Sequence, residues 1–137
     1  MSVFEQQELR KRGYAEAMRY MDNAKENLQK AGKEDGYYND KKYVRTACGT
    51  AYNGVLIALD TYLALKGIYA NKRRKSIEFY EEQIGKMDRK LLKEVNNMYQ
   101  ILHLSGYYDG TQDVFIVKRG FDIAYQIINT IKPDDYS

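Results

Sequence analysis

The fold is decided by residues 43–67, which read YVRTACGTAYNGVLIALDTYLALKG. Apolar side chains recur there in steps of three and four residues, the spacing that places them along one side of a helix. Tyr52, Leu56 and Leu63 widen this stripe, so much of the circumference of the helix is apolar. The segment therefore predicts a long helix at the centre of a helical core. The stripe consists of Val44, Cys48, Ala51, Val55, Leu59 and Tyr62.

A first helix is predicted before this segment. Ser2 followed by Glu5 is typical of a capping box at a helix start, and Gly32 is a typical helix stop. Gly13 weakens the helix from within. We therefore expect residues 1–12 to form a loosely attached arm of a single domain that spans residues 1–137.

The other helix boundaries are marked by caps and breakers. Asn39 or Asp40 is expected to cap the central helix, and Lys66 with Gly67 to end it. Further helices are predicted over residues 76–84, from a cap at 88 to a break at 105–110, and from a cap at Thr111 to Pro133. No convincing alternation of polar and apolar residues indicates a strand. The pattern predicts an all-α fold, a five-helix up-and-down bundle with a long central second helix.

Composition bounds the class of protein. The 137 residues suffice for one core, and the net charge of +3 is too small by itself to indicate a nucleic-acid partner. The polar start predicts no secretory signal, and the apolar run at 55–65 is too short to cross a membrane. The single cysteine, Cys48, lies on the apolar stripe and favours a reducing, cytoplasmic setting.

Small residues follow one another on the central helix at Ala47, Ala51, Gly54 and Ala58. Small side chains allow two helix backbones to approach closely. Two interpretations stay open, tight packing inside the monomer and a two-fold homodimer interface.

Polar residues on the same helix are candidates for ligand binding. Arg45, Asn53 and Asp60 lie on its more polar side, where a carboxylate must be paired or hydrated. Asp60 is expected either to pair with Arg45 or Arg119 or to line a groove.

His103, the only histidine, excludes multi-histidine metal sites. It is expected near the end of the fourth helix, where it either favours the terminal carbonyl groups or acts as an acid or base at a ligand site. Tyr107 and Tyr108, like Tyr37 and Tyr38, are expected in loops. Their rings either fold back over the bundle ends or contact a partner, by stacking on bases or at a protein interface.

One basic run stands out, formed by Lys72, Arg73, Arg74 and Lys75. Acidic residues shortly after it can neutralise it. The run is therefore interpreted either as a solvated segment or as a nucleic-acid contact.

The order of motifs resembles the HEPN superfamily of helical bundles. The matching segments are AYNGVL at 51–56 inside the central helix, LKG at 65–67, SIEF at 76–79 and YYD at 107–109. The resemblance covers roughly residues 40–130 and implies a helical bundle. The chain also resembles small, uncharacterised helical proteins of Bacteroidetes.

Many HEPN proteins are ribonucleases in which four to six residues separate an arginine from a histidine that follows it. This chain has Asn96, Asn97 and Met98 at those positions before His103. The resemblance therefore implies a non-catalytic member, a dimeric binding module or one paired with a nucleotidyltransferase.

We therefore expect a non-enzymatic, homodimeric binding or interaction module that needs no cofactor or metal. The alternative is a nucleotide- or RNA-binding protein, and a more remote one is a divergent ribonuclease that uses His103.

Overall fold

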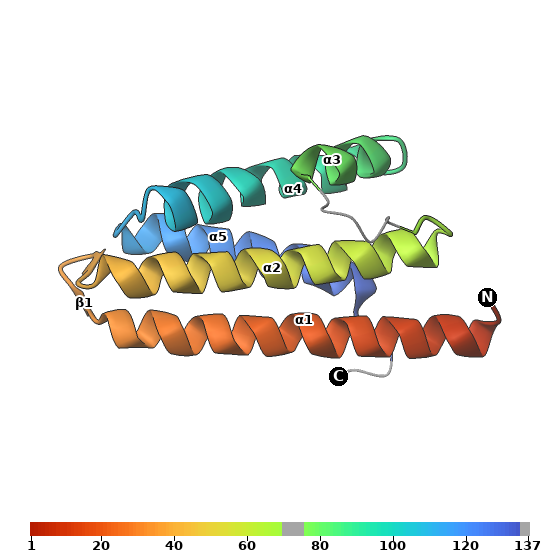
Figure 1. The fold of residues 1–137 in the computed structure, drawn as a ribbon, viewed down its shortest axis with the longest axis horizontal. Helices are drawn as coiled ribbons and strands as arrows, with labels where there is room; N and C mark the ends of the chain where they lie inside the picture. The colour runs from red at the N-terminus through yellow and green to blue at the C-terminus, as the bar shows by residue number, and fades with distance from the viewer. Residues whose placement is uncertain (70–75, 135–137) are drawn as a thin grey trace.

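The computed structural model describes residues 1–69 and 76–134. Five α-helices make up most of the described chain, which also contains one short hairpin, a π-helix and a 3₁₀ turn (Figure 1). This confirms the predicted all-α, five-helix architecture. The elements are α1 Val3–Ala31, β1 Lys33–Glu34, β2 Tyr37–Tyr38, α2 Lys41–Leu65, α3 Ile77–Gly85, α4 Arg89–Met98, η1 Tyr99–Tyr108, α5 Val114–Ile128 and η2 Asn129–Ile131.

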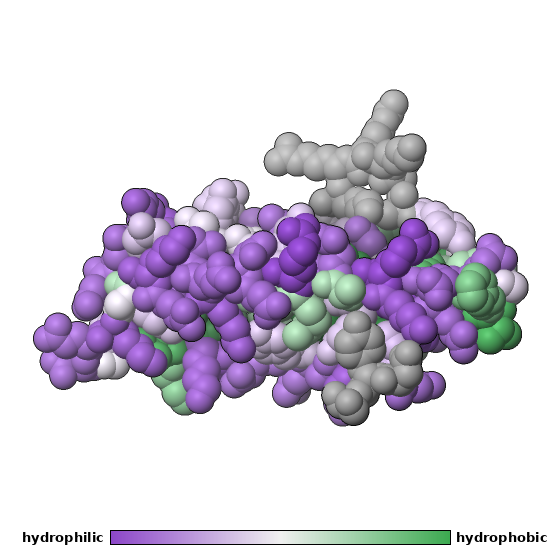
Figure 2. Space-filling model, turned by 90° about the horizontal axis from the view of Figure 1, so that it is seen from below, coloured by the Kyte–Doolittle hydropathy of each residue, from purple (hydrophilic) through white to green (hydrophobic). Residues whose placement is uncertain are grey.

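The α2 helix lies at the centre of the bundle, as the apolar stripe predicted. It runs antiparallel to α1 on one side, while α3, α4 and η1 cover another side and α5 lies behind it (Figure 1). Val44, Val55 and Leu59 are fully buried, because α2 has neighbours around most of its circumference. The outward face of α1 is almost wholly hydrophilic (Figure 2). No helix within the two described ranges has the length and apolar character needed to cross a membrane.

Most helix starts follow the predicted caps. Ser2 and Glu5 form the capping box of α1, and Asp40 and Asp88 cap α2 and α4 through their carboxylates. The cap of α5 differs from the prediction. Asp113, not Thr111, accepts a hydrogen bond from the backbone N–H of Ile116 at 3.1 Å. A carboxylate satisfies a free N–H at a helix start as a hydroxyl would, and it also interacts favourably with the helix dipole.

The predicted arm is a continuous part of α1. Residues 3–12 are helical, and α1 continues through Gly13 without a break. Gly13 is a point of close contact with α2. A Cβ atom at Gly13 would lie 2.1 Å from Thr61 Oγ1 on α2. The glycine therefore allows α1 and α2 to approach closely rather than ending the helix.

The connection between α1 and α2 is a small β-hairpin where a loop was expected. Lys33 pairs with Tyr38 and Glu34 with Tyr37, across a turn in which Asp35 and Gly36 have positive φ angles of 53° and 83°. The hairpin also binds the start of α5, because the N–H of Val114 donates to the carbonyl oxygen of Gly36. The α1–α2 connection and the start of α5 therefore form one end of the bundle.

The fourth helix does not break at Ser105. It continues from α4 into η1, a ten-residue π-helix that ends at Tyr108. Gly106 lies against α2, where a Cβ atom would come within 2.4 Å of Cys48 Sγ. This glycine of the predicted break thus allows a close helix contact. His103 consequently lies within η1 instead of at a helix end, and Tyr107 and Tyr108 belong to a helix instead of a loop.

Candidate ligand-binding groove between α2 and η1

A groove of about 420 Å³ lies between the first half of α2 and η1. It brings together three of the residues predicted to bind a ligand, Asn53, His103 and Tyr107, from segments about fifty residues apart in the sequence. We call it the His103 groove. Its lining residues are Thr46, Gly49, Thr50, Tyr52, Asn53, His103 and Tyr107.

The imidazole ring of His103 lies at the centre of a cluster of tyrosine rings. Its centroid is 4.5 Å from that of Tyr52, 5.0 Å from that of Tyr99 and 5.7 Å from that of Tyr107. The Tyr107 ring is nearly parallel to the imidazole, with an interplanar angle of 15°, whereas Tyr108 meets it edge-on at 5.0 Å. Offset and edge-to-face arrangements of this kind are the favourable ones for aromatic rings.

The π-helix explains how one histidine contacts so many rings of its own helix. Hydrogen bonds from residue i to i+5 put more residues in each turn than an α-helix holds. Residues at i, i+4, i+8 and i+9 therefore gather on one side of η1, where Tyr99, His103, Tyr107 and Tyr108 stand. The sequence did not predict this cluster, because residues 105–110 were expected to break the helix.

Gly49 brings the Tyr107 ring close to the backbone of α2. A Cβ atom at Gly49 would lie 2.9 Å from Tyr107 Cδ1, so the ring occupies the space that a side chain would need. Gly49 was assigned no role from the sequence alone. A glycine within an otherwise apolar helix is the signal in the sequence that some group packs on it closely.

The groove is built from uncharged side chains. Burial lowers the pKa of His103 from its ordinary value, since it disfavours the imidazolium form. Burial also raises the pKa of the Tyr52 hydroxyl to about 12. At neutral pH the imidazole and the Tyr52 hydroxyl are therefore both neutral, and the amide of Asn53 with the hydroxyls of Thr46 and Thr50 supplies polar contacts.

Two cations lie at one end of the groove. A Cβ atom at Gly110, just beyond η1, would lie 2.6 Å from Lys41 Cε and 2.7 Å from Arg45 Nε. Lys41, Arg45 and Gly49 succeed one another at four-residue spacing on α2, so this basic pair starts about one helical turn from the groove. Arg45, predicted as a ligand-binding residue, is thus placed beside the groove, though it does not line it.

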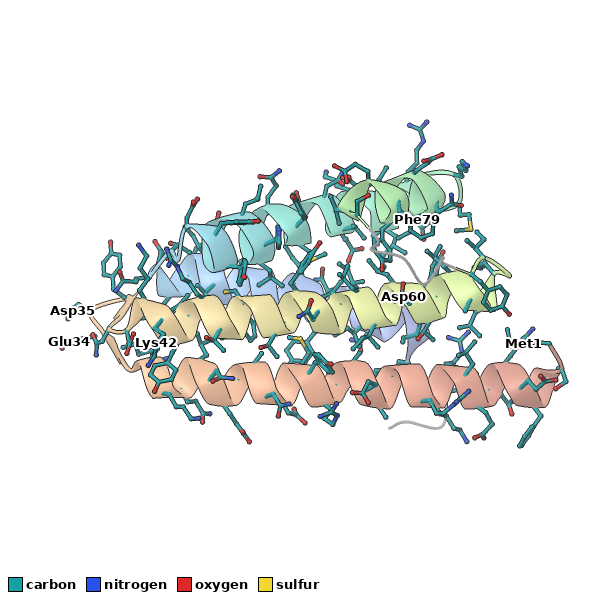
Figure 3. The ribbon with its side chains drawn as sticks, viewed as in Figure 1. Met1, Glu34, Asp35, Lys42, Asp60 and Phe79 are labelled. Atoms are coloured by element: carbon teal, nitrogen blue, oxygen red, sulfur yellow. The ribbon has the colours of Figure 1, made fainter. Side chains whose placement is uncertain are left out.

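Asp60 lies apart from these residues, on the side of α2 that faces α3 (Figure 3). The hydroxyl of Tyr80 donates a hydrogen bond of 2.8 Å to Asp60 Oδ1. The predicted partners differ, since Arg45 lies at the other end of α2 and Arg119 is an exposed residue of α5. Burial, and next the bond to Asp60, raise the pKa of Tyr80. The carboxylate thus has a defined partner outside the groove.

For the four small residues of α2, the structure favours tight packing inside the monomer, the first of the two interpretations. Ala47, Ala51 and Ala58 are fully buried within the single chain, and Gly54 is buried as well. A Cβ atom at Gly54 would meet Tyr20 Cβ at 3.0 Å, with the carbonyl oxygen of Ala17 at 3.3 Å. The small face therefore packs against α1 and offers no surface to a second copy.

The remaining candidates have no place in the groove. The thiol of Cys48 is buried, and burial raises its pKa to about 12, so thiolate chemistry is disfavoured. The basic run from Lys72 to Lys75 lies outside the described residues. Among residues 1–69 and 76–134, no three His, Cys, Asp or Glu side chains gather as a metal site would require.

Comparison with known proteins identifies the family. Residues 12–133 match the family described as Domain of unknown function (DUF5618). The chain belongs to this family. A solved structure described as a protein of unknown function from Dyadobacter fermentans is similar to it, with 41% sequence identity and a TM-score of 0.79. That match covers 89% of this chain and 94% of the other.

None of the curated proteins compared with the chain matches it. The DUF5618 match includes every residue that lines the His103 groove. It begins after the first turns of α1, which carry several exposed apolar residues at the other end of the molecule.

Proposed function

We propose that the chain is a non-enzymatic binding module whose His103 groove binds a nucleotide. The observation that carries this proposal is the combination of a cluster of neutral aromatic rings with a pair of cations, Arg45 and Lys41, about one and two helical turns before Gly49 on α2. A nucleotide has the matching parts, a flat, uncharged base and a negatively charged phosphate. The proposal follows the second of the two functions expected from the sequence and keeps the non-catalytic character of the first.

The aromatic cluster suits the base. Tyr107 is 46% exposed, so one side of its ring is available although the ring also packs on Gly49. Stacking of a base on an aromatic side chain contributes about 1–3 kcal/mol. Asn53 and Thr50 line the groove beside the ring and carry both donors and acceptors for the base edge.

The basic pair suits the phosphate. Arg45 and Lys41 are exposed, so their charges stay available to a ligand. Guanidinium groups bind phosphate oxygens through two parallel hydrogen bonds, and lysine adds a point charge. Because Asp109 precedes Gly110 directly, the local positive potential is modest and fits one phosphate better than a long polyanion.

Binding is favoured over cleavage by the surroundings of His103. Within the described residues, its ring neighbours are all tyrosines, and none is a carboxylate that would orient the imidazole as a base. The resemblance to the HEPN superfamily agrees with a nucleotide ligand. This chain lacks the arginine that ribonucleases of that superfamily carry before the histidine, and its absence also favours binding over cleavage.

The test is isothermal titration calorimetry of the full chain with AMP, with adenosine and ribose 5-phosphate as partial ligands. We expect AMP to bind more tightly than either part. Tyr107→Ala should weaken both AMP and adenosine by about tenfold, while Arg45→Gln should weaken AMP and leave adenosine unchanged. Tyr69→Ala, an exposed tyrosine at the other end of the molecule, is the matched control. If the native chain, Tyr107→Ala and Arg45→Gln gave the same heats of binding with AMP, the proposal would be refuted.

Self-association stays a prediction. A homodimer would use a surface other than the four small residues of α2, which are buried within one chain. Light scattering across micromolar concentrations tests it directly. A nucleotidyltransferase partner is implied by the HEPN resemblance alone, and a reducing, cytoplasmic setting by the lone buried Cys48.

A further inference from the structure

A second pocket lies where α1 ends and the hairpin begins. It has a volume of about 380 Å³ and shares no lining residue with the His103 groove. We call it the hairpin pocket. Its lining residues are Lys25, Leu28, Gln29, Gly32, Lys33 and Tyr38.

Local structure explains why these side chains meet. The residues from α1 and its C-cap, Gly32, follow one another at i, i+3, i+4 and i+7, so they lie along one side of the helix. Lys33 is paired with Tyr38 across the hairpin. Side chains of directly opposed residues lie on the same face of a ladder, which puts the lysine and the phenol beside each other.

The backbone around the pocket is already hydrogen-bonded. The carbonyl oxygen of Gly32 accepts from the N–H of Asn39 at 2.8 Å, and the N–H of Tyr38 donates to the carbonyl oxygen of Gln112 at 2.7 Å. The carbonyl oxygen of Tyr38 accepts from the Gln112 side chain at 2.8 Å. The polar groups that remain for a ligand are therefore the ends of side chains.

The hydroxyl of Tyr38 is the most informative of these groups. Tyr38 is only 7% exposed, and its hydroxyl has no hydrogen-bond partner among residues 1–69 and 76–134. Burial raises the pKa of this hydroxyl, so it keeps its proton at neutral pH. A hydroxyl on a buried side chain is expected to have an acceptor, and a ligand in the pocket can supply one.

Two ammonium groups add to this donor. Lys25 and Lys33 are exposed, and neither forms an ion pair within the part of the chain that the structure describes. The ammonium group of Lys25 lies 5.3 Å from the centroid of the Tyr125 ring, which holds it beside α5. Two lysines and a phenol give the pocket an excess of donors, so the complementary ligand group is an acceptor.

The nearby negative charges lie outside the pocket. Asp22, Glu26 and Glu34 are close in sequence to the two lysines, and none of them lines it. Glu34 follows Lys33 in the strand, so its side chain lies on the opposite face of the hairpin, and Figure 3 shows it at the outer end. The carbonyl end of α1 disfavours an anion. The attraction of an anion therefore depends on the two ammonium groups and the phenol.

The pocket also has an apolar part and a limited size. Leu28 is half-buried and lies beside the ring of Tyr38 in the lining. The volume of about 380 Å³ is near the lower end of the range for small-molecule pockets. A small ligand with an apolar body therefore fits better than a polymer.

We infer that the hairpin pocket binds a small carboxylic acid with a flat apolar body. The body packs on Leu28 and the ring of Tyr38, and the carboxylate accepts hydrogen bonds from Lys33 and the Tyr38 hydroxyl, with Lys25 as a second charge. A carboxylate has two oxygen atoms with about four lone-pair sites, which suits three separate donors. The inference is independent of nucleotide binding in the His103 groove.

The test is a titration of the full chain with naphthoate, followed by the amide chemical shifts in NMR. Naphthamide has the same body without the charge, and acetate has the charge without the body. We expect a Kd of about 1 mM for naphthoate and binding at least about tenfold weaker for the other two. Lys33→Gln and Tyr38→Phe should each weaken naphthoate by about fivefold, and Tyr38→Phe should leave the free energy of unfolding unchanged because the hydroxyl has no partner to lose.

The matched control is Lys30→Gln, the same change at an exposed lysine of α1 outside the pocket. It should leave naphthoate binding within about twofold of the native value. Equal weakening by Lys30→Gln and Lys33→Gln would overturn the inference, because only net charge would then matter. Equal affinity for naphthoate and naphthamide, or for naphthoate and acetate, would also overturn it. So would loss of naphthoate binding in Tyr107→Ala, which would place the acid in the His103 groove.

Discussion

The α2 helix meets two neighbours, α1 and η1, through glycines, and the two contacts differ in outcome. Against α1, Gly13 and Gly54 bring two regular helices together, and the small residues between them are buried. Against η1, Gly106 and Gly49 also allow close approach, but a groove and a ring cluster lie beside the contact. A close approach between two regular helices therefore gives only tight packing, without a groove. The groove arises where the partner is a π-helix that gathers its rings on one side.

The largest effect is expected from a substitution at the contact between α2 and η1. Gly106→Ala would place a Cβ atom 2.4 Å from Cys48 Sγ and 2.6 Å from Cys48 Cβ. We expect a loss of about 2 kcal/mol in the free energy of unfolding, since overpacking exceeds the gain in helix propensity of about 1 kcal/mol. Urea unfolding measures it, and AMP binding should be lost as well because η1 must shift.

Two comparisons sharpen this prediction. Gly13→Ala should cost a similar amount of stability but leave AMP binding intact, since Gly13 lies on the α1 contact. Gly85→Ala should change little, because its nearest neighbour is the end of the Leu92 side chain at 3.2 Å. A stable Gly106→Ala variant that binds AMP normally would show that this contact does not position η1.

A smaller loss of stability is expected on the other side of α2. Tyr80→Phe removes the hydrogen bond to Asp60 and leaves a half-buried carboxylate oxygen with one donor fewer. The free energy of unfolding should fall by about 1–2 kcal/mol, measured by urea unfolding, while AMP binding stays unchanged. Tyr69→Phe, which removes an exposed hydroxyl, is the control. If the two variants were equally stable, the bond to Asp60 would contribute no net stability.

Alkaline pH is expected to weaken the contact between α2 and η1. Burial raises the pKa of Cys48 from 9.0 to about 12, so above the lower value the unfolded chain loses the proton and the folded chain keeps it. The stabilising contribution is therefore full below pH 9.0 and is lost as the pH rises toward about 12. The thiol alone should cost about 1 kcal/mol per pH unit in that window. Urea unfolding against pH should show a shallower slope in Cys48→Ala, and an unchanged slope would contradict this origin.

The smallest expected effect is on the histidine itself. The chain has one histidine, so its imidazole signal in a proton NMR titration is unambiguous. The pKa of His103 should lie below 6.5, and the stability linked to the neutral ring should be lost as the pH falls through the folded value. Tyr107→Ala should move the pKa of His103 back toward 6.5, because it exposes the ring. A pKa of His103 above 6.5 in the native chain would show that burial is not the main influence on it.

Much of the fold was predictable because it depends on local patterns. The period of α2, the capping box at Ser2 and the carboxylate cap at Asp88 each depend on residues within one or two turns of one another. The errors concern residues whose role depends on a distant neighbour. Residues 105–110 were interpreted as a helix break because the contact that Gly106 makes, with Cys48, lies on another helix.

The candidate site was predicted in part for the same reason. Asn53, His103 and Tyr107 were chosen as polar or aromatic residues in conspicuous places, and the structure brings them into one groove. Tyr52 and Tyr99 were not assigned to a site, because in sequence they are ordinary residues of amphipathic helices. Gly49 was not assigned either, because a glycine in a helix signals close packing without identifying the group that packs on it. Asp60 was assigned and lies elsewhere, bonded to Tyr80, whose position depends on how α3 packs on α2.

The amino-acid sequence by itself determined the helices and the central place of α2, because hydrophobic period and end caps act over a few neighbouring residues. Only the tertiary structure decided that His103 stands among four tyrosines and that the small face of α2 is covered by α1. Both depend on distances between segments far apart in the chain. These distances are set by close packing of whole helices, which no local pattern encodes.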